Sequence, residues 1–333
     1  MRKYKWGILA PGRIAHRFAE GLQLLDNAVL WAVGSRNAER ASEFAGMYGF
    51  KRSYGSYEEL VTDTDLDVVY VASPHSHHHE HTLLCLNHGK HVICEKAFSL
   101  NLKEVTEMIE TAQRKRLFLM EALWPPFQPS YREAERIINS GEMGEVLSMA
   151  GRFGFRSPYD PASRVFDLKL GGGSLLDIGI YPVMDILRYM GMPDEVTAIA
   201  SFAPTGADDS LLAVFDYADG RKSTAYSSFL EDSGVGTKII MDGGSLILER
   251  NRERGQILVI EQEDREPVTK AYKPLSSGFS YEAEEVMKCL DAGKTESEVV
   301  PHSFSHDLMA LLDRIRNAAG IEYPGRLLSR IGC

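Results

Sequence analysis

The sequence predicts two domains: an α/β domain with a doubly wound parallel sheet, then an α+β domain with a large, mostly antiparallel sheet. Strands and helices alternate over the first 120 residues, whereas hairpin signals dominate the later part. A length of 333 residues also fits two domains of ~100–200 residues each. We place the boundary at Trp124-Pro125-Pro126, which gives domains 1–123 and 124–333, with a closing helix that can return to the first domain.

The first half alternates short apolar strands with helical patterns. The run Asp67-Val68-Val69-Tyr70-Val71-Ala72 is rich in β-branched residues and is bounded by Ser73-Pro74, so it predicts a strand buried on both faces. Short connections between such elements indicate a parallel sheet with helices on both faces. We expect strands at 6–10, 29–34, 51–54, 67–72, 91–94 and 117–120, and helices at 14–25, 38–48, 56–61, 78–87 and 102–115.

The second half contains longer strands with local turns. Ala218-Asp219-Gly220 and Asp242-Gly243-Gly244 are typical hairpin turns, which predicts a largely antiparallel sheet. We expect strands at 146–155, 196–202, 211–217, 223–230, 238–241, 245–249 and 257–261, and helices at 130–139, 281–291 and 303–319.

Composition excludes several classes of protein. The chain has 47 acidic and 37 basic residues, a formal charge of −10, which disfavours nucleic acid or an anionic membrane as its partner. Hydrophobic residues make up 44% and charged residues 25%, as in ordinary folded domains. Four scattered cysteines, the absence of a signal-peptide pattern and the absence of an ~18-residue apolar run predict a cytoplasmic protein.

The segment after the first strand predicts a dinucleotide site. In Gly7-Ile8-Leu9-Ala10-Pro11-Gly12-Arg13-Ile14-Ala15, Gly12 and Ala15 fill two of the three small-residue positions of the fingerprint, and Ala10 occupies the first. A helix N-terminus there binds phosphate well. The alternative is a tight strand–helix turn without a ligand.

The end of the second strand favours NADP over NAD. An acidic residue usually binds the ribose 2′-hydroxyl about 20 residues past the glycine-rich turn, but this chain has Gly34-Ser35-Arg36 there, and the nearest acid is Glu39. A hydroxyl and a guanidinium suit a 2′-phosphate, although Arg36 also fits a solvated surface residue.

Seven of the ten histidines lie between His75 and His91. Pairs such as His77 with His81 have helical zinc-ligand spacing, but no HExxH or CxxC pattern accompanies them. We therefore expect no metal, and a polar helix start in which one or two histidines border the nucleotide pocket.

Two further segments carry candidate chemistry. Glu95-Lys96 follows the strand at 91–94, where a lysine can direct its charge toward a substrate oxygen; the alternative is a solvated ion pair. After Gly171-Gly172-Gly173, Asp177 and Tyr181 share one helical face, and a cation can make a phenol a useful acid or base. Alternatively, Ser174 and Asp177 form a capping box, Tyr181 is a core aromatic residue and Pro182 kinks the helix.

Together these segments resemble the glucose-fructose oxidoreductase / inositol dehydrogenase (Gfo/Idh/MocA) family over nearly the whole chain. The resemblance rests on parts in family order: the glycine-rich turn, Ser73-Pro74-His75-x-x-His78, Gly89-Lys90-His91-Val92, Glu95-Lys96 and the Gly-Gly-Gly…Asp…Tyr segment. Met120-Glu121-Ala122-Leu123-Trp124 and Leu176-Asp177-Ile178-Gly179-Ile180-Tyr181 are similar to dimeric dihydrodiol dehydrogenases and NADP-dependent aldose dehydrogenases. Ala97 replaces the family's usual Pro, which would loosen that loop.

The resemblance implies a Rossmann domain, a second domain whose open sheet supports a homodimer or homotetramer, and hydride transfer with a sugar-like or diol carbon. It also implies residue roles. The catalytic residues are Lys96, Tyr181 and Asp177; the cofactor residues are Gly12, Arg13, Ile14, Ser35, Arg36, Arg40, Pro74, His75, His78, Glu95 and Lys96; and the substrate residues are Trp124, Arg164, Asp177, Tyr181 and Phe279.

These observations lead to one preferred hypothesis and two alternatives. We expect an NADP-dependent dehydrogenase, with NAD as the other possible cofactor, that acts on a small polyol, sugar or diol. In it Tyr181 takes the hydroxyl proton, Lys96 stabilises the phenolate and the developing alkoxide, and Asp177 orients a neighbouring hydroxyl. The alternatives are a non-catalytic NAD(P)-binding regulator of the same fold and a zinc hydrolase that uses the histidine cluster.

Overall fold

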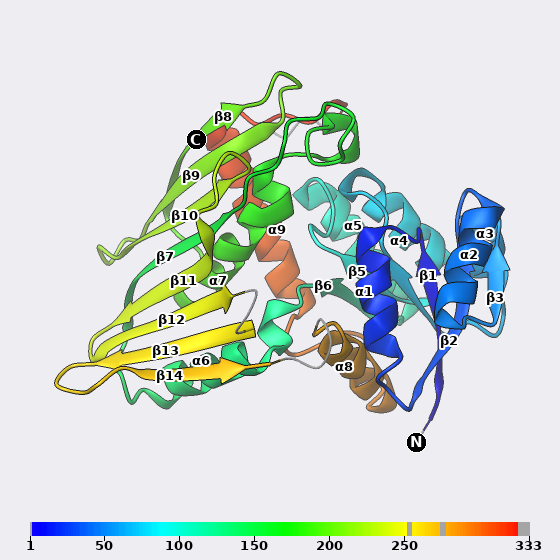
Figure 1. Cartoon of the computed structure of the whole chain (residues 1–333), viewed down its shortest axis with the longest axis horizontal. Coiled ribbons are helices and arrows are strands. Elements are labelled where there is room, and N and C mark those ends of the chain that lie inside the picture. The colour runs from blue at the N-terminus through cyan, green and yellow to red at the C-terminus, as the bar shows by residue number, and fades with distance from the viewer. Residues whose placement is uncertain (1, 252–254, 274–277, 326–333) are drawn as a thin grey trace. The chain divides into compact units, whose positions relative to one another are not determined.

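The computed structural model describes residues 2–251, 255–273 and 278–325 of the chain (Figure 1). Its contacts divide it into two compact units: unit 1 comprises residues 1–127 with 275–306, and unit 2 comprises residues 128–274 with 307–333. Each unit is built on its own sheet, as the sequence predicts. Among the described residues, one stretch, Leu168–Met190, is long and apolar enough to cross a membrane by length and composition, and 83% of its window is buried inside the protein.

The described part of unit 1 contains a six-stranded parallel sheet in the order β3-β2-β1-β4-β5-β6. Chain order reverses between β1 and β4, and in such sheets ligands bind outside the carboxyl ends of the strands at that point. Helix α1 packs against α8, and α4 packs against α5. The bounds are β1 Tyr4–Leu9, α1 Arg13–Leu22, β2 Ala28–Gly34, α2 Ala38–Tyr48, β3 Arg52–Tyr54, α3 Tyr57–Thr62, β4 Val68–Val71, a 3₁₀ turn η1 His75–His77, α4 His78–Asn87, β5 His91–Glu95, α5 Leu102–Lys115, β6 Leu119–Ala122, a 3₁₀ turn η2 Pro125–Phe127 and α8 Ser280–Asp291.

Helix α8 comes from a distant part of the chain and packs closely on α1. A Cβ atom added at Gly21 of α1 would lie 2.9 Å from the Ser280 backbone nitrogen, so this glycine allows the close approach. The Tyr4 hydroxyl donates to Asp291 Oδ1 at 2.6 Å. Burial, together with this bond, raises the pKa of Tyr4 to about 12.

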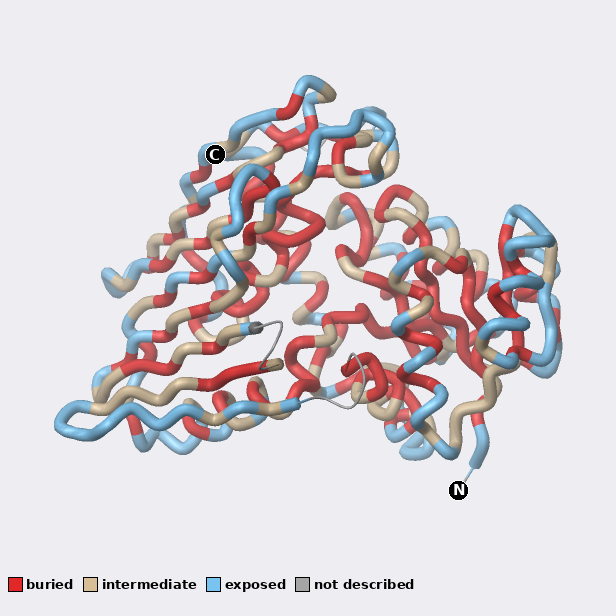
Figure 2. Tube along the Cα trace, in the orientation of Figure 1, coloured by how far each residue is buried: buried red, intermediate tan, exposed pale blue. Residues whose placement is uncertain are grey.

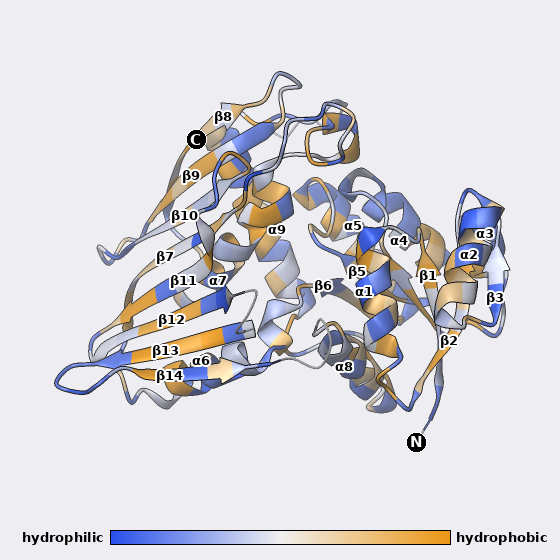
Figure 3. Ribbon diagram, in the orientation of Figure 1, coloured by the Kyte–Doolittle hydropathy of each residue, from blue (hydrophilic) through white to orange (hydrophobic). Residues whose placement is uncertain are grey.

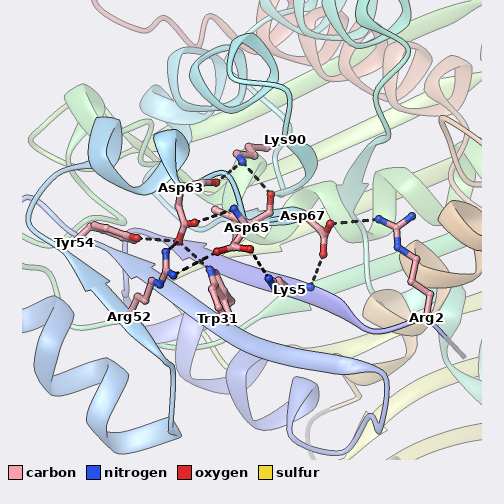
Figure 4. Close-up of polar contacts among 10 residues, drawn as sticks. Arg2, Lys5, Trp31, Arg52, Tyr54, Asp63, Asp65, Asp67 and Lys90 are labelled. Atoms are coloured by element: carbon pink, nitrogen blue, oxygen red, sulfur yellow. Dashed lines mark hydrogen bonds and ion pairs between the residues drawn. The ribbon is translucent and has the colours of Figure 1, made fainter.

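A polar network fixes the connection between α3 and β4 (Figure 4). The Asp63 carboxylate accepts hydrogen bonds from Trp31 at 2.9 Å, Arg52 at 3.1 Å and Tyr54 at 2.8 Å. Burial opposes the charge of Asp63, but the hydrogen bonds outweigh it and lower its pKa. The Lys90 ammonium donates to the Asp63 carbonyl at 2.5 Å. This network therefore anchors the start of β4, whose other end leads to the candidate site.

The described part of unit 2 contains an eight-stranded sheet in the order β14-β13-β12-β11-β7-β10-β9-β8. Among the described strands of this sheet, β7 and β10 form the single parallel pair, and the other neighbouring strands are antiparallel. The bounds are α6 Pro129–Ser140, β7 Val146–Gly154, a 3₁₀ turn η3 Leu168–Leu170, a π-helical turn η4 Leu175–Gly179, α7 Ile180–Met190, β8 Glu195–Phe202, β9 Asp208–Asp216, β10 Lys222–Ser228, β11 Gly234–Met241, β12 Gly244–Asn251, β13 Gly255–Gln262 and β14 Val268–Tyr272. The last helix, α9 His302–Ala319, begins in the last residues of unit 1 and continues in unit 2.

The two faces of this sheet differ. Helix α7 packs on β7, β10 and β11, and α6 packs on β12, β13 and β14. Buried and exposed residues alternate along the strands (Figure 2). The outward positions include apolar residues, among them Ile199, which is 67% exposed, and its cross-strand partner Leu212. Hydrophobic residues also run along β12 and β13 (Figure 3).

Most predicted elements are confirmed, and their ends differ by a few residues. The helices expected at 78–87 and 102–115 are α4 and α5. Strand β14 was not predicted, because Val268-Thr269-Lys270-Ala271-Tyr272 is a short, half-polar edge strand. The helix expected after the three glycines begins instead as the π-helical turn η4, which leads directly into α7.

Candidate functional site

The turn between β1 and α1 has the backbone geometry of an anion-binding site. Ala10 takes φ +68°, in the left-handed region that favours glycine, and Gly12 precedes the first residue of α1. A Cβ atom added at Gly12 would have its nearest neighbours at 3.8 and 3.9 Å, so the protein itself does not require glycine there. The first turn of α1, which is fully described, contains no acidic residue. Its backbone N–H groups are therefore well suited to a phosphate.

Cationic residues gather at the carboxyl end of β2. Ser35 is buried and accepts a hydrogen bond from the Asn37 backbone at 3.2 Å. Asn37 in turn accepts from the Arg40 backbone at 2.9 Å and caps α2. Burial raises the pKa of Tyr57, while the guanidinium groups of Arg36 and Arg40 act in the opposite direction and so lie near it. The structure thus places a hydroxyl, two guanidinium groups and an aromatic ring together.

His78 connects two parts of the site. It is fully buried, with Nδ1 2.7 Å from the Ala97 carbonyl oxygen and Nε2 2.7 Å from the Ser73 carbonyl oxygen. Burial lowers the pKa of His78 to about 4, although both carbonyls favour the charged form. The His75 ring packs edge-on against it, with centroids 5.6 Å apart. His78 therefore ties the segment after Lys96 to the turn after β4, and Ala97 in that segment is fully buried.

Lys96 follows β5 in a segment that is held on both sides. The Tyr70 hydroxyl donates to the Glu95 carboxylate, and the Phe98 backbone donates to Glu121 Oε1 at 2.9 Å. Burial raises the pKa of Glu121 to about 7. The peptide bond between Lys96 and Ala97 is cis, and Lys96 itself is half-buried. These contacts fix the backbone on both sides of Lys96, which follows β5 at the carboxyl end of the sheet.

Two predicted substrate residues, Trp124 and Phe279, also come together in unit 1. Trp124 follows β6 and Phe279 precedes α8, and their ring centroids are 6.3 Å apart. Because they come from distant parts of the sequence, their contact depends on the packing of α8.

Asp177 lies in the π-helical turn of unit 2. Such turns occur often at functional sites because they change the direction of side chains within a helix. Ser174 Oγ donates to Asp208 Oδ2 at 2.9 Å, and the Leu175 backbone donates to the same oxygen at 2.7 Å. Ser174, which is fully described, makes no capping bond, so the capping-box interpretation is wrong. Asp208, not Asp177, organises this turn.

Asp177 is paired with Arg164, another residue of the predicted substrate set. Arg164 Nη2 donates to Asp177 Oδ1 at 3.0 Å. The Arg164 side chain is 45% exposed and that of Asp177 is 11% exposed. The pair therefore presents both a donor and an acceptor for hydroxyl groups.

Tyr181 lies in the first turn of α7, beside aromatic residues. Its ring centroid is 5.5 Å from that of Phe153, and Phe155 packs edge-on against the buried Phe229. Pro182 is also in this first turn, directly after the π-helical turn η4, so the chain departs from regular α-helical geometry at this place. Tyr181 is half-buried, and the core-aromatic interpretation does not describe it fully.

A second set of polar groups near Tyr181 could not be predicted in full from the sequence. Asp185, one helical turn later, accepts from Thr237 Oγ1 at 2.5 Å and from the Tyr131 hydroxyl at 3.3 Å. Burial raises the pKa of Asp185 to about 7. The i,i+4 spacing of Tyr181 and Asp185 was visible in the sequence, but Tyr131 and Thr237 lie far away along the chain. No pattern in the sequence around Asp208 indicated that its carboxylate would bind Ser174 and Leu175.

Two family models match this chain. One, described as an oxidoreductase family with an NAD-binding Rossmann fold, matches residues 4–123, and the other, described as a GFO/IDH/MocA C-terminal domain, matches residues 131–247. Trans-1,2-dihydrobenzene-1,2-diol dehydrogenase of Xenopus laevis is 33% identical over 334 residues, covering 96% of this chain and 99% of that protein. The enzyme of the same name from Homo sapiens is 32% identical over 329 residues, covering 96% and 98%.

Solved structures share the fold. Levoglucosan dehydrogenase in complex with NADH and levoglucosan superposes with a TM-score of 0.86 at 20% identity, over 97% of this chain and 100% of that chain. A 3-ketoreductase from Actinomadura kijaniata in complex with NADP and TDP-benzene gives 0.85 at 22% identity, over 96% and 98%. An aldose-aldose oxidoreductase from Caulobacter crescentus gives 0.86 at 24% identity, over 96% and 98%.

Proposed function

This chain belongs to the Gfo/Idh/MocA oxidoreductase family and is an NAD(P)-dependent dehydrogenase that acts on CH–OH groups, and we propose that it uses NADP with Tyr181 as the acid–base group. The substrate we propose is a sugar, a sugar derivative or a vicinal diol. The observation that carries the proposal is the Arg164–Asp177 pair, whose aspartate lies four residues before Tyr181. It supplies groups that bind hydroxyls close to a phenol that can move a proton.

The preference for NADP is supported by the residues at the end of β2. Arg36 and Arg40 are exposed, and Ser35 offers a hydroxyl from the strand end. Guanidinium groups bind a 2′-phosphate by charge-assisted hydrogen bonds, whereas the 2′-hydroxyl of NAD usually requires an acidic residue. Together with Gly12, Arg13 and Ile14 at the phosphate turn, and Pro74, His75 and Glu95 beyond it, these residues would hold the dinucleotide. The buried His78, proposed from the sequence as a cofactor residue, would instead position the turn after β4, because both of its ring nitrogens face backbone carbonyls.

The proposed chemistry divides the work among three side chains. When bound, the nicotinamide group accepts or supplies the hydride. Tyr181 Oη takes the proton of the substrate hydroxyl during oxidation and returns it during reduction. Lys96 stabilises the negative charge on the phenolate and on the developing alkoxide, and Asp177 accepts a hydrogen bond from a neighbouring hydroxyl. The mechanism requires Lys96 and Tyr181 to act on the same substrate molecule.

The aromatic residues near Tyr181 support a substrate with an apolar face. Phe153 and Phe155 are half-buried, and they sit beside the core formed by Phe166, Ile178, Ala203 and Phe229. A sugar ring or a cyclic diol has C–H surfaces as well as hydroxyls. Such a molecule would place its hydroxyls on Asp177 and Arg164 and its carbon skeleton on the aromatic side chains.

Two properties of the whole protein are part of the proposal. We expect a homodimer or homotetramer formed through the outward face of the eight-stranded sheet, because Ile199, Leu212 and Ile240 are exposed there. We also expect a cytoplasmic location, since the described cysteines Cys85, Cys94 and Cys289 are free, buried thiols.

The decisive experiment measures redox turnover with NADP and with NAD over a panel of sugars and vicinal diols. We expect NADP-linked turnover that falls by ~10²–10⁴-fold in Tyr181→Phe. Tyr272→Phe, on the edge strand β14 of the same sheet, is the matched control and should keep normal turnover. A double variant with Lys96→Met should lose little more than the worse single variant, because both groups serve one step.

Outcomes that contradict the proposal are equally clear. Dinucleotide binding without turnover on any panel member would favour a regulator of the same fold. Full additivity of the two losses would show that Lys96 and Tyr181 do not act in one step.

A further inference from the structure

Three side chains at the start of α4 converge on one point. His77 Nδ1 lies 2.5 Å from Glu80 Oε1, and His81 Nε2 lies 3.6 Å from the same oxygen. Potential ligand atoms of these three residues all lie within 4.8 Å of one another. Their spacing of three and four residues places them on one face of the helix. Among the described residues, these three form the one group of histidine, cysteine and carboxylate side chains whose ligand atoms lie close enough to share a metal ion.

We propose that His77, Glu80 and His81 form a binding site for a divalent cation of the zinc class. Two imidazoles and one carboxylate are a donor set that suits zinc and its first-row neighbours, whereas magnesium and calcium prefer oxygen donors alone. In a tetrahedral zinc site with bonds of about 2.1 Å, ligand atoms are about 3.4 Å apart. The separation between Glu80 and His81 already matches, and the 60% exposed Glu80 side chain can rotate to widen its distance to His77.

The surroundings of His81 support this assignment. His81 Nδ1 lies 2.9 Å from Ser73 Oγ, so one ring nitrogen has a hydrogen-bond partner and the other points to Glu80. A metal-bound histidine is commonly oriented by such a bond on its second nitrogen. The His77 and His81 rings are also nearly parallel, with centroids 5.5 Å apart and an angle of 20° between their planes. Both nitrogen donors therefore reach the same side of the helix.

The neighbouring histidines have other partners, which makes them matched controls. His79 Nε2 lies 3.0 Å from Glu107 Oε2 of α5. His88 Nδ1 lies 2.9 Å from the Leu84 carbonyl oxygen at the end of α4. An ion at the proposed site would join the turn η1 to the helix α4, so it would stabilise unit 1 against unfolding.

The test uses the full-length chain, stripped with a chelator and free of dinucleotide and substrate. Calorimetric titration with Zn²⁺ should give one ion per chain, and Mg²⁺ and Ca²⁺ should give none. Zn²⁺ at a hundredfold excess over its Kd should raise Tm by about 3–5 °C. His77→Gln and Glu80→Gln should each weaken binding by at least ~10-fold, and Ser73→Ala should weaken it by roughly 10-fold.

His79→Gln and His88→Gln should keep wild-type affinity, which separates the site from the general attraction of a histidine-rich segment for metals. Co²⁺ should give the visible absorption of a tetrahedral complex, and His81→Gln should abolish it. Absence of stoichiometric Zn²⁺, or equal losses in all the histidine variants, would overturn the proposal. Because no dinucleotide or substrate is present, this outcome is independent of the proposed dehydrogenase activity.

Discussion

The candidate residues of unit 1 and those of unit 2 are positioned in different ways. In unit 1 they follow the carboxyl ends of successive parallel strands: Gly12 after β1, Ser35 after β2, His75 after β4 and Lys96 after β5. In unit 2 Asp177 lies in a π-helical turn and Tyr181 in the helix after it. Asp208 of β9 binds the start of this turn, and Arg164 of a loop pairs with Asp177. Topology therefore brings the first set to one edge of the sheet, where contacts such as Tyr70–Glu95 fix the segment around Lys96, whereas the second set has no such strand order and depends on specific long-range polar contacts.

The largest expected effect is that of replacing Lys96, which tests whether a residue of unit 1 takes part in catalysis rather than in dinucleotide binding alone. Lys96→Met should lower turnover by at least ~10³-fold, because the ammonium group would no longer stabilise the phenolate and the alkoxide. The dinucleotide Kd, measured by fluorescence titration, should change by less than about threefold, since binding rests on the remaining contacts. Lys103→Met, on the exposed face of α5, is the control. Wild-type turnover in Lys96→Met would remove Lys96 from the mechanism.

The next effect concerns substrate binding in unit 2. Arg164→Ala should raise KM by about 10- to 100-fold, because a charge-assisted hydrogen bond contributes about 1.5–3 kcal/mol. Arg156→Ala, an exposed arginine in the same loop, should leave KM unchanged. An equal rise in both variants would indicate a general effect of loop charge rather than the Arg164–Asp177 pair.

Substitutions at two glycines of unit 1 should affect different properties, one dinucleotide binding and the other stability. Gly12→Ala should weaken dinucleotide binding by at least ~10-fold and leave Tm nearly unchanged, because the protein leaves space for its Cβ. Gly21→Ala should do the reverse and destabilise the protein by about 1–3 kcal/mol, since its Cβ would press on the backbone of α8. Denaturant unfolding curves and dinucleotide titrations of both variants measure these opposite effects.

Stability should depend on pH through buried acids, most directly through Asp208. Burial raises its pKa from 3.8 to about 7, so between these values the folded state binds more protons than the unfolded state. The free energy of unfolding should therefore fall as pH rises from about 4 to 7. Asp208→Asn keeps an acceptor for Ser174 and Leu175 and should flatten this slope. Asp209→Asn, on the next residue, should retain the wild-type slope.

The smallest effect is expected at the phosphate turn. Ala10→Gly should stabilise the protein by up to ~1 kcal/mol, because φ +68° costs alanine more than glycine. Ala15→Gly, within α1, should destabilise it by about 1 kcal/mol. A loss of stability in Ala10→Gly would show that chain entropy outweighs the relief at this position.

Much of unit 1 was predictable because its signals are local. Apolar runs and helical patterns joined by short connections predicted the alternation of β1 to β6 with the helices between them, and the motifs at strand ends followed from that order. The proximity of Trp124 and Phe279 required α8, which arrives from more than 150 residues later in the chain. In unit 2, the predicted capping box at Ser174 was wrong because Asp208 attracts the same serine.

By itself, the sequence determined the two-sheet plan, the family and the residue types available for chemistry, since periodicity and turn residues report local burial and backbone shape. The tertiary structure decided which polar groups share a partner: Asp208 with the turn before α7, His78 with Ala97, and His77 and His81 with Glu80. A buried or half-buried polar group takes whichever partner the packing brings within about 3 Å, and that choice depends on strand register and helix contacts far away along the chain.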